Sequence, residues 1–205
     1  MNRRNYQKEL DRIIENIEKE GLCPTLLLHS CCAPCSSYVL KYLSEYFRIT
    51  LLYFNPNISP ESEYVKRVEE QKRLINSMPL KNAVEFVEGR YEPKEFYGAV
   101  KGFEEEPEGG KRCHICYEMR LREAAEYAAK GGYDYFTTTL SISPLKKSDV
   151  LNEIGERVGA ECGVRHLPSD FKKKEGYKQS IELSKEYDLY RQNFCGCIFS
   201  KRQVE

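Results

Sequence analysis

Three cysteines fall within five residues, at positions 31, 32 and 35, where a predicted strand gives way to a predicted helix. The apolar run at residues 25–28 predicts the strand, and the spaced apolar residues from Tyr38 to Tyr46 predict an amphipathic helix. Pro34 suits the first turn of that helix. Thiols at a helix N-terminus lie near its positive end, which favours the thiolate, the form that binds metal or attacks. This thiol turn therefore indicates metal or redox chemistry rather than packing.

The remaining cysteines support this interpretation. The chain has 205 residues, enough to bury a core without disulfides, so its nine cysteines are not needed as a framework. Residues 1–20 are charged throughout and lack the apolar segment of a signal peptide, and no apolar run approaches membrane-spanning length. We therefore expect a cytoplasmic protein without membrane contact, in which clustered reduced thiols indicate a metal or redox site.

Predicted strands and helices alternate along the chain. Strands are expected at residues 25–29, 48–55, 84–87, 133–140 and 161–167. Helices are expected at residues 2–20, 60–78, 93–100, 113–130 and 178–187. Two further helices are expected, one directly after the thiol turn and one that begins at Ser148. Ser59 and Ser148 are the expected N-caps, and residues 101–112 are expected to form an exposed mobile loop. The alternation predicts an α/β fold with an open parallel sheet of about five strands and helices on both faces.

We expect one domain over residues 1–205, with an N-terminal helix within 1–21 and a C-terminal helix and cysteine tail over 176–205. Function in such sheets collects beyond the carboxyl ends of the strands. The thiol turn leaves the first strand at that edge, and the Cys113 and Cys116 pair opens a helix that begins there. Cys195 and Cys197 can reach the same edge if the last helix packs back.

Seven of the nine cysteines therefore form three groups, 31/32/35, 113/116 and 195/197, whereas Cys23 and Cys162 stand alone as expected ordinary thiols. A [4Fe–4S] cluster takes at most four thiolates from the protein, and structural zinc also takes four ligands. Seven thiolates thus exceed one site. Two zinc ions could be held with help from histidine, so a zinc-stapled RNA-binding module without catalysis stays open.

The chain resembles the QueH family, the cobalamin-independent epoxyqueuosine reductases, in several stretches. These are HSCCAPCSS at 29–37, YFNPNI at 53–58, RCHICYEMRL at 112–121, TTTLSISP at 137–144, DFKKKEGY at 170–177 and YRQNFCGCIFS at 190–200. The resemblance implies a Rossmann-like fold akin to the adenine-nucleotide hydrolases. It also implies an iron–sulfur oxidoreductase that reduces the epoxide of epoxyqueuosine in the tRNA anticodon loop to queuosine, the last step of queuosine biosynthesis.

On this interpretation all seven clustered cysteines are metal ligands. We expect the [4Fe–4S] cluster to use Cys113 and Cys116 with at least one of Cys31, Cys32 and Cys35. Cys195 and Cys197 are expected to hold a second metal ion, iron or zinc, or to form a redox pair opposite the cluster. Asp170 is the expected proton donor, and an external electron donor is required.

A tRNA anticodon loop presents phosphates and unstacked bases, so its recognition needs cations and aromatic faces. The net charge is zero, with 32 basic and 32 acidic residues, which argues against a strongly basic binder but allows local patches. Expected substrate contacts are Asn55, Asn57, Ser141, Lys172, Lys173 and Tyr177, with further cations at Lys146, Lys147, Lys174, Lys201 and Arg202.

An ATP-dependent, iron–sulfur tRNA thiolase of the same fold group is the rival interpretation. It should carry a glycine- and serine-rich phosphate loop after the first strand. This chain has Cys31 to Cys35 there, with no glycine. We therefore predict that epoxide reduction, followed by mass spectrometry of the tRNA nucleosides, proceeds at the same rate with and without ATP. Turnover that depends on ATP would contradict this prediction.

Overall fold

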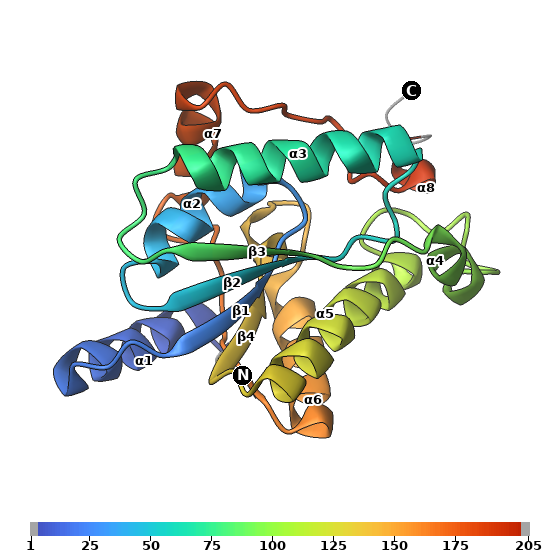
Figure 1. Ribbon diagram of the computed structural model, residues 1–205. Helices are drawn as coiled ribbons and strands as arrows, with labels where there is room; N and C mark the ends of the chain where they lie inside the picture. The colour runs from blue at the N-terminus through green and yellow to red at the C-terminus, as the bar shows by residue number, and fades with distance from the viewer. Residues whose placement is uncertain (1–3, 202–205) are drawn as a thin grey trace.

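The computed structural model describes residues 4–201, so Arg202 lies outside the described part of the chain. Its centre is an all-parallel, five-stranded sheet in the order β3-β2-β1-β4-β5 (Figure 1). The strands are β1 (Thr25–His29), β2 (Arg48–Tyr53), β3 (Val84–Glu88), β4 (Tyr135–Thr138) and β5 (Arg165–His166). β1 pairs with β2 on one side and β4 on the other, so the strand order reverses there. The predicted Rossmann-like sheet is confirmed, and its switch point lies at the end of β1.

Helices cover both faces of the sheet (Figure 1). They are α1 (Tyr6–Glu20), α2 (Ala33–Leu43), α3 (Glu61–Ser77), α4 (Pro93–Ala99), α5 (Lys111–Gly131), α6 (Ser148–Cys162), α7 (Gly176–Glu186) and α8 (Ile198–Lys201), with a 3-10 turn η1 (Thr139–Ile142). Apolar residues of α1, α2, α3 and α7 share one core, and those of α5 and α6 share another. A third small cluster joins α4, α5 and α8.

α1 shows how the sequence specifies these elements. Asn5 accepts a hydrogen bond from the Lys8 amide and caps the helix start. Leu10, Ile14 and Ile17 follow at helical spacing and are buried. Gly21, with φ 64°, takes the left-handed conformation that ends the helix.

Two predicted caps are wrong. α3 begins at Glu61 with Pro60 at the N-cap position, and α6 begins at Ser148 itself with Lys147 at the N-cap position. Neither N-cap makes a side-chain hydrogen bond. Acidic residues in the first turns, among them Glu61 and Asp149, instead complement the helix dipoles.

Three strands, β2, β4 and β5, are shorter than the sequence predicts, and β2 ends at Tyr53 rather than at residue 55. β4 stops at Thr138 because its hydroxyl accepts a hydrogen bond from the Leu140 amide and turns the chain into η1. β5 contains only Arg165–His166, because α6 continues to Cys162 and the chain then turns at Gly163. These changes give the carboxyl edge of the sheet more irregular backbone than periodicity indicated.

The segment expected to be an exposed mobile loop is fastened to a buried arginine. α5 begins at Lys111, two residues earlier than predicted, and Arg112 is buried within its first turn. Its Nη1 donates to the carbonyl oxygens of Glu104 and Glu106. The loop therefore consists of turns held against the start of α5.

The start of α7 packs too closely on α2 to admit a side chain at Gly176. A Cβ there would lie 2.0 Å from the Phe171 carbonyl oxygen and 2.5 Å from the Tyr38 ring. We predict that Gly176→Ala lowers the free energy of unfolding by about 1–3 kcal/mol, measured by urea denaturation.

Gly98→Ala is the matched control, because a Cβ at Gly98 in α4 meets nothing within 4 Å. Replacing a helical glycine without a clash stabilises by up to about 1 kcal/mol. Equal changes in the two variants would contradict the packing argument.

Candidate metal and substrate site

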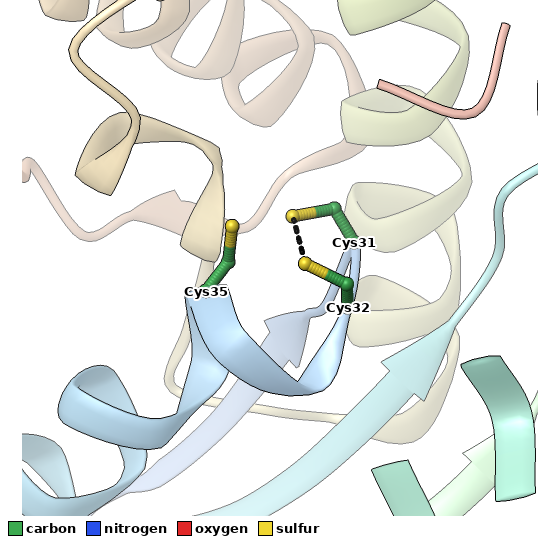
Figure 2. A group of neighbouring side chains, drawn as sticks. All are labelled: Cys31, Cys32 and Cys35. Carbon is green, nitrogen blue, oxygen red and sulfur yellow. Dashed lines mark hydrogen bonds between the residues drawn. The ribbon is translucent and has the colours of Figure 1, made fainter. Parts of the chain in front are cut away.

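The first thiol group sits at the switch point of the sheet. Cys31 and Cys32 form the turn after β1, and Cys35 lies in the first turn of α2 (Figure 2). The three Sγ atoms lie within 4.8 Å of one another, and those of Cys31 and Cys32 are 3.9 Å apart. These residues, called here the three-thiol group, can hold one metal centre.

Buried hydrogen bonds fix the backbone that carries this group. His29 is fully buried, and its two ring nitrogens lie 2.8 Å from the Thr138 hydroxyl and 3.1 Å from the Phe54 carbonyl. Burial lowers the pKa of His29 to about 4, so the ring is neutral at physiological pH. Asn55 donates to the Ser30 carbonyl at 2.8 Å. The end of β1 is thus held from both neighbouring strands.

Hydrogen bonding within the three-thiol group favours one thiolate. Hydrogen bonds from Cys31 and Cys35 lower the pKa of Cys32 well below its usual value. The guanidinium of Arg67, on α3, is buried and adds to this effect. A thiolate is the form that binds metal, so Cys32 is the thiol of this group that is most ready to bind one, whereas the pKa values of Cys31 and Cys35 are raised by their hydrogen bonds to neighbouring cysteines and by burial.

The second group contains four thiols. Cys113 and Cys116 in the first turns of α5 line a small cavity together with Cys195 and Cys197 of the C-terminal tail. Gly196, with φ 103°, lets the backbone bend between the two tail cysteines. We call these residues the four-thiol group.

Helix α3 holds the tail in this position. The Ser59 amide, just before α3, donates to the Gly196 carbonyl at 2.9 Å. Arg67 Nη1 donates to the Cys195 carbonyl at 3.3 Å, and its Nε is paired with Glu63 at 2.7 Å. The two tail thiols are therefore positioned by hydrogen bonds that the carbonyl groups of the tail accept from α3 and from the residue before it.

The structure groups the thiols as three and four. The sequence led us to expect the helix pair to join the thiol turn and the tail pair to stand apart. Instead the tail pair, Cys195 and Cys197, lines the same small cavity as the helix pair, Cys113 and Cys116. Cys195 also lines a second, larger cavity beside the three-thiol group. The two groups are therefore neighbours, whereas Cys23 and Cys162 line neither cavity.

A larger cavity of about 320 Å³ opens beside the three-thiol group. Its walls combine thiols, cations and apolar side chains from α2, α3, η1 and the segment after it, α7 and the tail. They include Cys31, Cys32, Cys35, Arg67, Leu140, Lys146, Tyr177, Arg191, Gln192, Phe194 and Cys195. A pocket of this size and mixed lining suits a small organic group.

Of the six expected substrate contacts, Tyr177 lines this cavity and Lys173 is exposed on the segment before it. Asn57 lines the cavity of the four-thiol group. Asn55, Ser141 and Lys172 hold backbone in place: Lys172 Nζ donates to the Ser141 and Lys146 carbonyls, at 2.9 and 3.2 Å.

Asp170, the expected proton donor, does not line the large cavity. Its carboxylate is paired with Lys172 Nζ at 2.9 Å, and the same Nζ donates to the Lys146 carbonyl. Lys146 itself lines the cavity and is only 8% exposed. Burial opposes its charge, yet the neighbouring Cys195, Tyr117 and Cys31 outweigh burial and raise the pKa of Lys146.

The sequence reasoning missed the buried arginines. Arg67, Arg112 and Arg120 are each at most 2% exposed. Arg67 lines the large cavity, and the other two line the cavity of the four-thiol group. A partial signal was present, because Cys116 and Arg120 are four residues apart on the helix predicted at 113–130, and Arg112 lies four residues before Cys116, at the end of the predicted loop. That spacing places them on one helix face, beside the thiols.

None of the helices in residues 4–201 combines the length and apolar character needed to cross a bilayer.

Comparison with known proteins covers almost the whole chain. Residues 26–203 match a family described as Epoxyqueuosine reductase QueH. A protein of that name from Staphylococcus epidermidis is 46% identical over 200 residues, covering 96% of this chain and 84% of the relative. The protein of that name from Streptococcus pyogenes is 42% identical, covering 97% of this chain and 78% of the relative. The one from Thermotoga maritima is 38% identical, covering 86% of this chain and 90% of the relative. The matched range contains all seven clustered cysteines.

Proposed function

Because the chain belongs to the QueH family of epoxyqueuosine reductases, we propose that it reduces the epoxide of epoxyqueuosine in a tRNA anticodon loop to queuosine, completing queuosine biosynthesis. We propose further that this oxidoreductase uses an iron–sulfur cluster. The observation that carries the proposal is the meeting of seven thiols from three distant segments around two adjoining cavities. An inert RNA-binding module would have no need of thiols facing an open cavity.

The donor sets suit two different centres. Four thiolates are the number that a [4Fe–4S] cluster takes from a protein, so we assign the cluster to the four-thiol group. The cavity that these thiols line measures about 20 Å³, so the side chains around it must rearrange to admit a cluster. Catalytic metal sites commonly have three protein ligands and one open position. The three-thiol group, on the wall of the large cavity, therefore suits the second metal ion, iron or zinc.

Reduction of the epoxide requires two electrons and two protons and releases the oxygen as water. When bound, the cluster relays electrons from an external donor one at a time, and the second metal ion polarises the oxygen as a Lewis acid. We assign the holding of that oxygen and the transfer of a proton to Lys146 Nζ, because Lys146 is a buried cation that lines the cavity beside the three-thiol group.

The cavity mouth suits an unstacked nucleoside. Tyr177 is 38% exposed and Leu145 is 68% exposed, and both line the cavity. An exposed aromatic ring offers a stacking face, and the exposed Lys173 lies in the turn before α7. We therefore keep Tyr177 and Lys173 as proposed tRNA contacts.

The assignment of the thiols to two metal sites predicts which cysteine variants lose the cluster absorbance and which lose turnover alone. Anaerobically reconstituted protein should contain about four iron and four sulfide per chain. Cys113→Ala and Cys197→Ala should lose the cluster absorbance together with turnover, because they remove ligands of the four-thiol group. Cys32→Ala should keep the cluster absorbance and lose turnover, because it disrupts only the second metal site.

Iron, sulfide and zinc analysis of each variant provides the check. Stoichiometric zinc without sulfide would support the zinc-stapled module instead. Loss of absorbance in Cys32→Ala as complete as in Cys113→Ala would show that the thiol turn also ligates the cluster.

The proton donor can be tested with two variants. Lys146→Met should lower the rate of epoxide reduction roughly 100-fold or more, because it removes the cavity-lining donor. Asp170→Asn should have a smaller effect, since the carboxylate contacts Lys172 rather than the cavity. Single-turnover rates with reduced, metal-loaded protein measure both. A larger loss in Asp170→Asn would restore Asp170 as the donor.

A further inference from the structure

Three buried polar side chains around the four-thiol group have hydrogen-bonding atoms without partners. They are Asn57, with both amide atoms free, Arg112, with Nε and Nη2 free, and Arg120, with Nη2 free. Each of the three residues is 1% exposed, and each lines the cavity that the four thiols share.

Such a concentration of unpartnered atoms is unusual. A buried donor left without a partner costs about 1–3 kcal/mol, and more when it is charged. Folded proteins therefore pair nearly all of these groups, and each exception requires an explanation. Of the eleven unpartnered side-chain atoms among the described residues, five belong to residues that line one cavity with four thiols, and four of these five are hydrogen-bond donors. This concentration of donors indicates that an acceptor of hydrogen bonds belongs there.

The guanidinium groups cannot simply turn elsewhere, because their other nitrogens are already engaged. Arg112 Nη1 donates to the Glu104 carbonyl at 2.6 Å. Arg120 Nε donates to the Cys116 carbonyl at 3.2 Å, and its Nη1 to Asn55 Oδ1 at 3.4 Å. The remaining N–H groups are thus held in place at the cavity.

The charges in the cavity agree with this arrangement. Burial opposes the charge of Arg120, but the neighbouring Cys116, Cys195 and Cys31 outweigh burial and raise its pKa. Arg112, Cys116 and Arg120 lie on one face of α5, so the helix that provides two thiols also provides two cations beside them.

We propose that Asn57, Arg112 and Arg120 form a donor shell that hydrogen-bonds the sulfur atoms of the metal centre in the four-thiol group and raises its reduction potential. This inference rests on the proposed function, which assigns the iron–sulfur cluster to that group. A cluster with four thiolate ligands is an anion, and reduction adds further negative charge. Hydrogen-bond donors and cations therefore stabilise the reduced state more than the oxidised state.

The experiment compares two arginines of the same helix. Arg120→Met removes a member of the donor shell, whereas Arg122→Met removes a surface residue that is paired with Glu118 and Glu161. Both proteins are reconstituted without oxygen, assayed for iron and sulfide, and titrated with a reductant while absorbance and electron paramagnetic resonance are recorded. We expect Arg120→Met to shift the one-electron reduction equilibrium at least tenfold toward the oxidised form, about 59 mV. Arg122→Met should match the wild type.

Asn57 supplies a second series that keeps the arginines, in case Arg120→Met does not fold. Asn57→Leu removes the donor at similar size, and Asn57→Asp adds a negative charge at the same place. The potential should fall in Asn57→Leu and fall further in Asn57→Asp.

The outcomes separate the two proposals. A wild-type protein that binds no iron and sulfide would overturn the proposed function. A wild-type cluster whose potential is the same in both Asn57 variants and in any folded Arg120 variant would overturn the donor shell alone.

Discussion

The site depends on cations buried beside thiols. Arg67, Arg120 and Lys146 are all at most 8% exposed, and the charges of neighbouring cysteines raise the pKa of each against the effect of burial. A buried cation without an anion is costly, and so is a buried thiolate without a cation. Each therefore offsets part of the cost of burying the other, although burial still raises the pKa of Cys116 to about 12 and also raises that of Cys197.

This balance requires three segments to meet, and the sheet topology brings two of them together. The thiol turn follows β1, and α5 begins at the same edge, because a helix that crosses back over a parallel sheet must start at the carboxyl ends of the strands. The third segment, the tail, is placed by α3. Arg73 donates to the Tyr187 and Asp188 carbonyls at 3.0 and 2.9 Å, and Arg67 donates to Cys195.

Much of the fold followed from local signals. Thr25–His29 was predicted with its observed bounds, and α1 ends at Glu20 as predicted, although it begins at Tyr6, after its Asn5 cap, rather than at residue 2. Predictions failed where a side chain beyond the local pattern intervened. Thr138 ended β4 early through its own hydroxyl, and Arg112 fastened a loop that composition alone described as mobile. Periodicity reports which residues face a core, but it does not report such individual hydrogen bonds.

The sequence by itself determined the parallel α/β fold, the family and the presence of seven clustered thiols, because periodicity and close spacing are local properties of a chain. Only the tertiary structure decided that these thiols divide into three and four, that Lys146 rather than Asp170 lines the cavity, and that Asn57, Arg112 and Arg120 converge on the four-thiol group. Those outcomes depend on contacts between segments far apart in the chain, such as the tail on α3. The spacing of residues along the chain contains no information about such contacts.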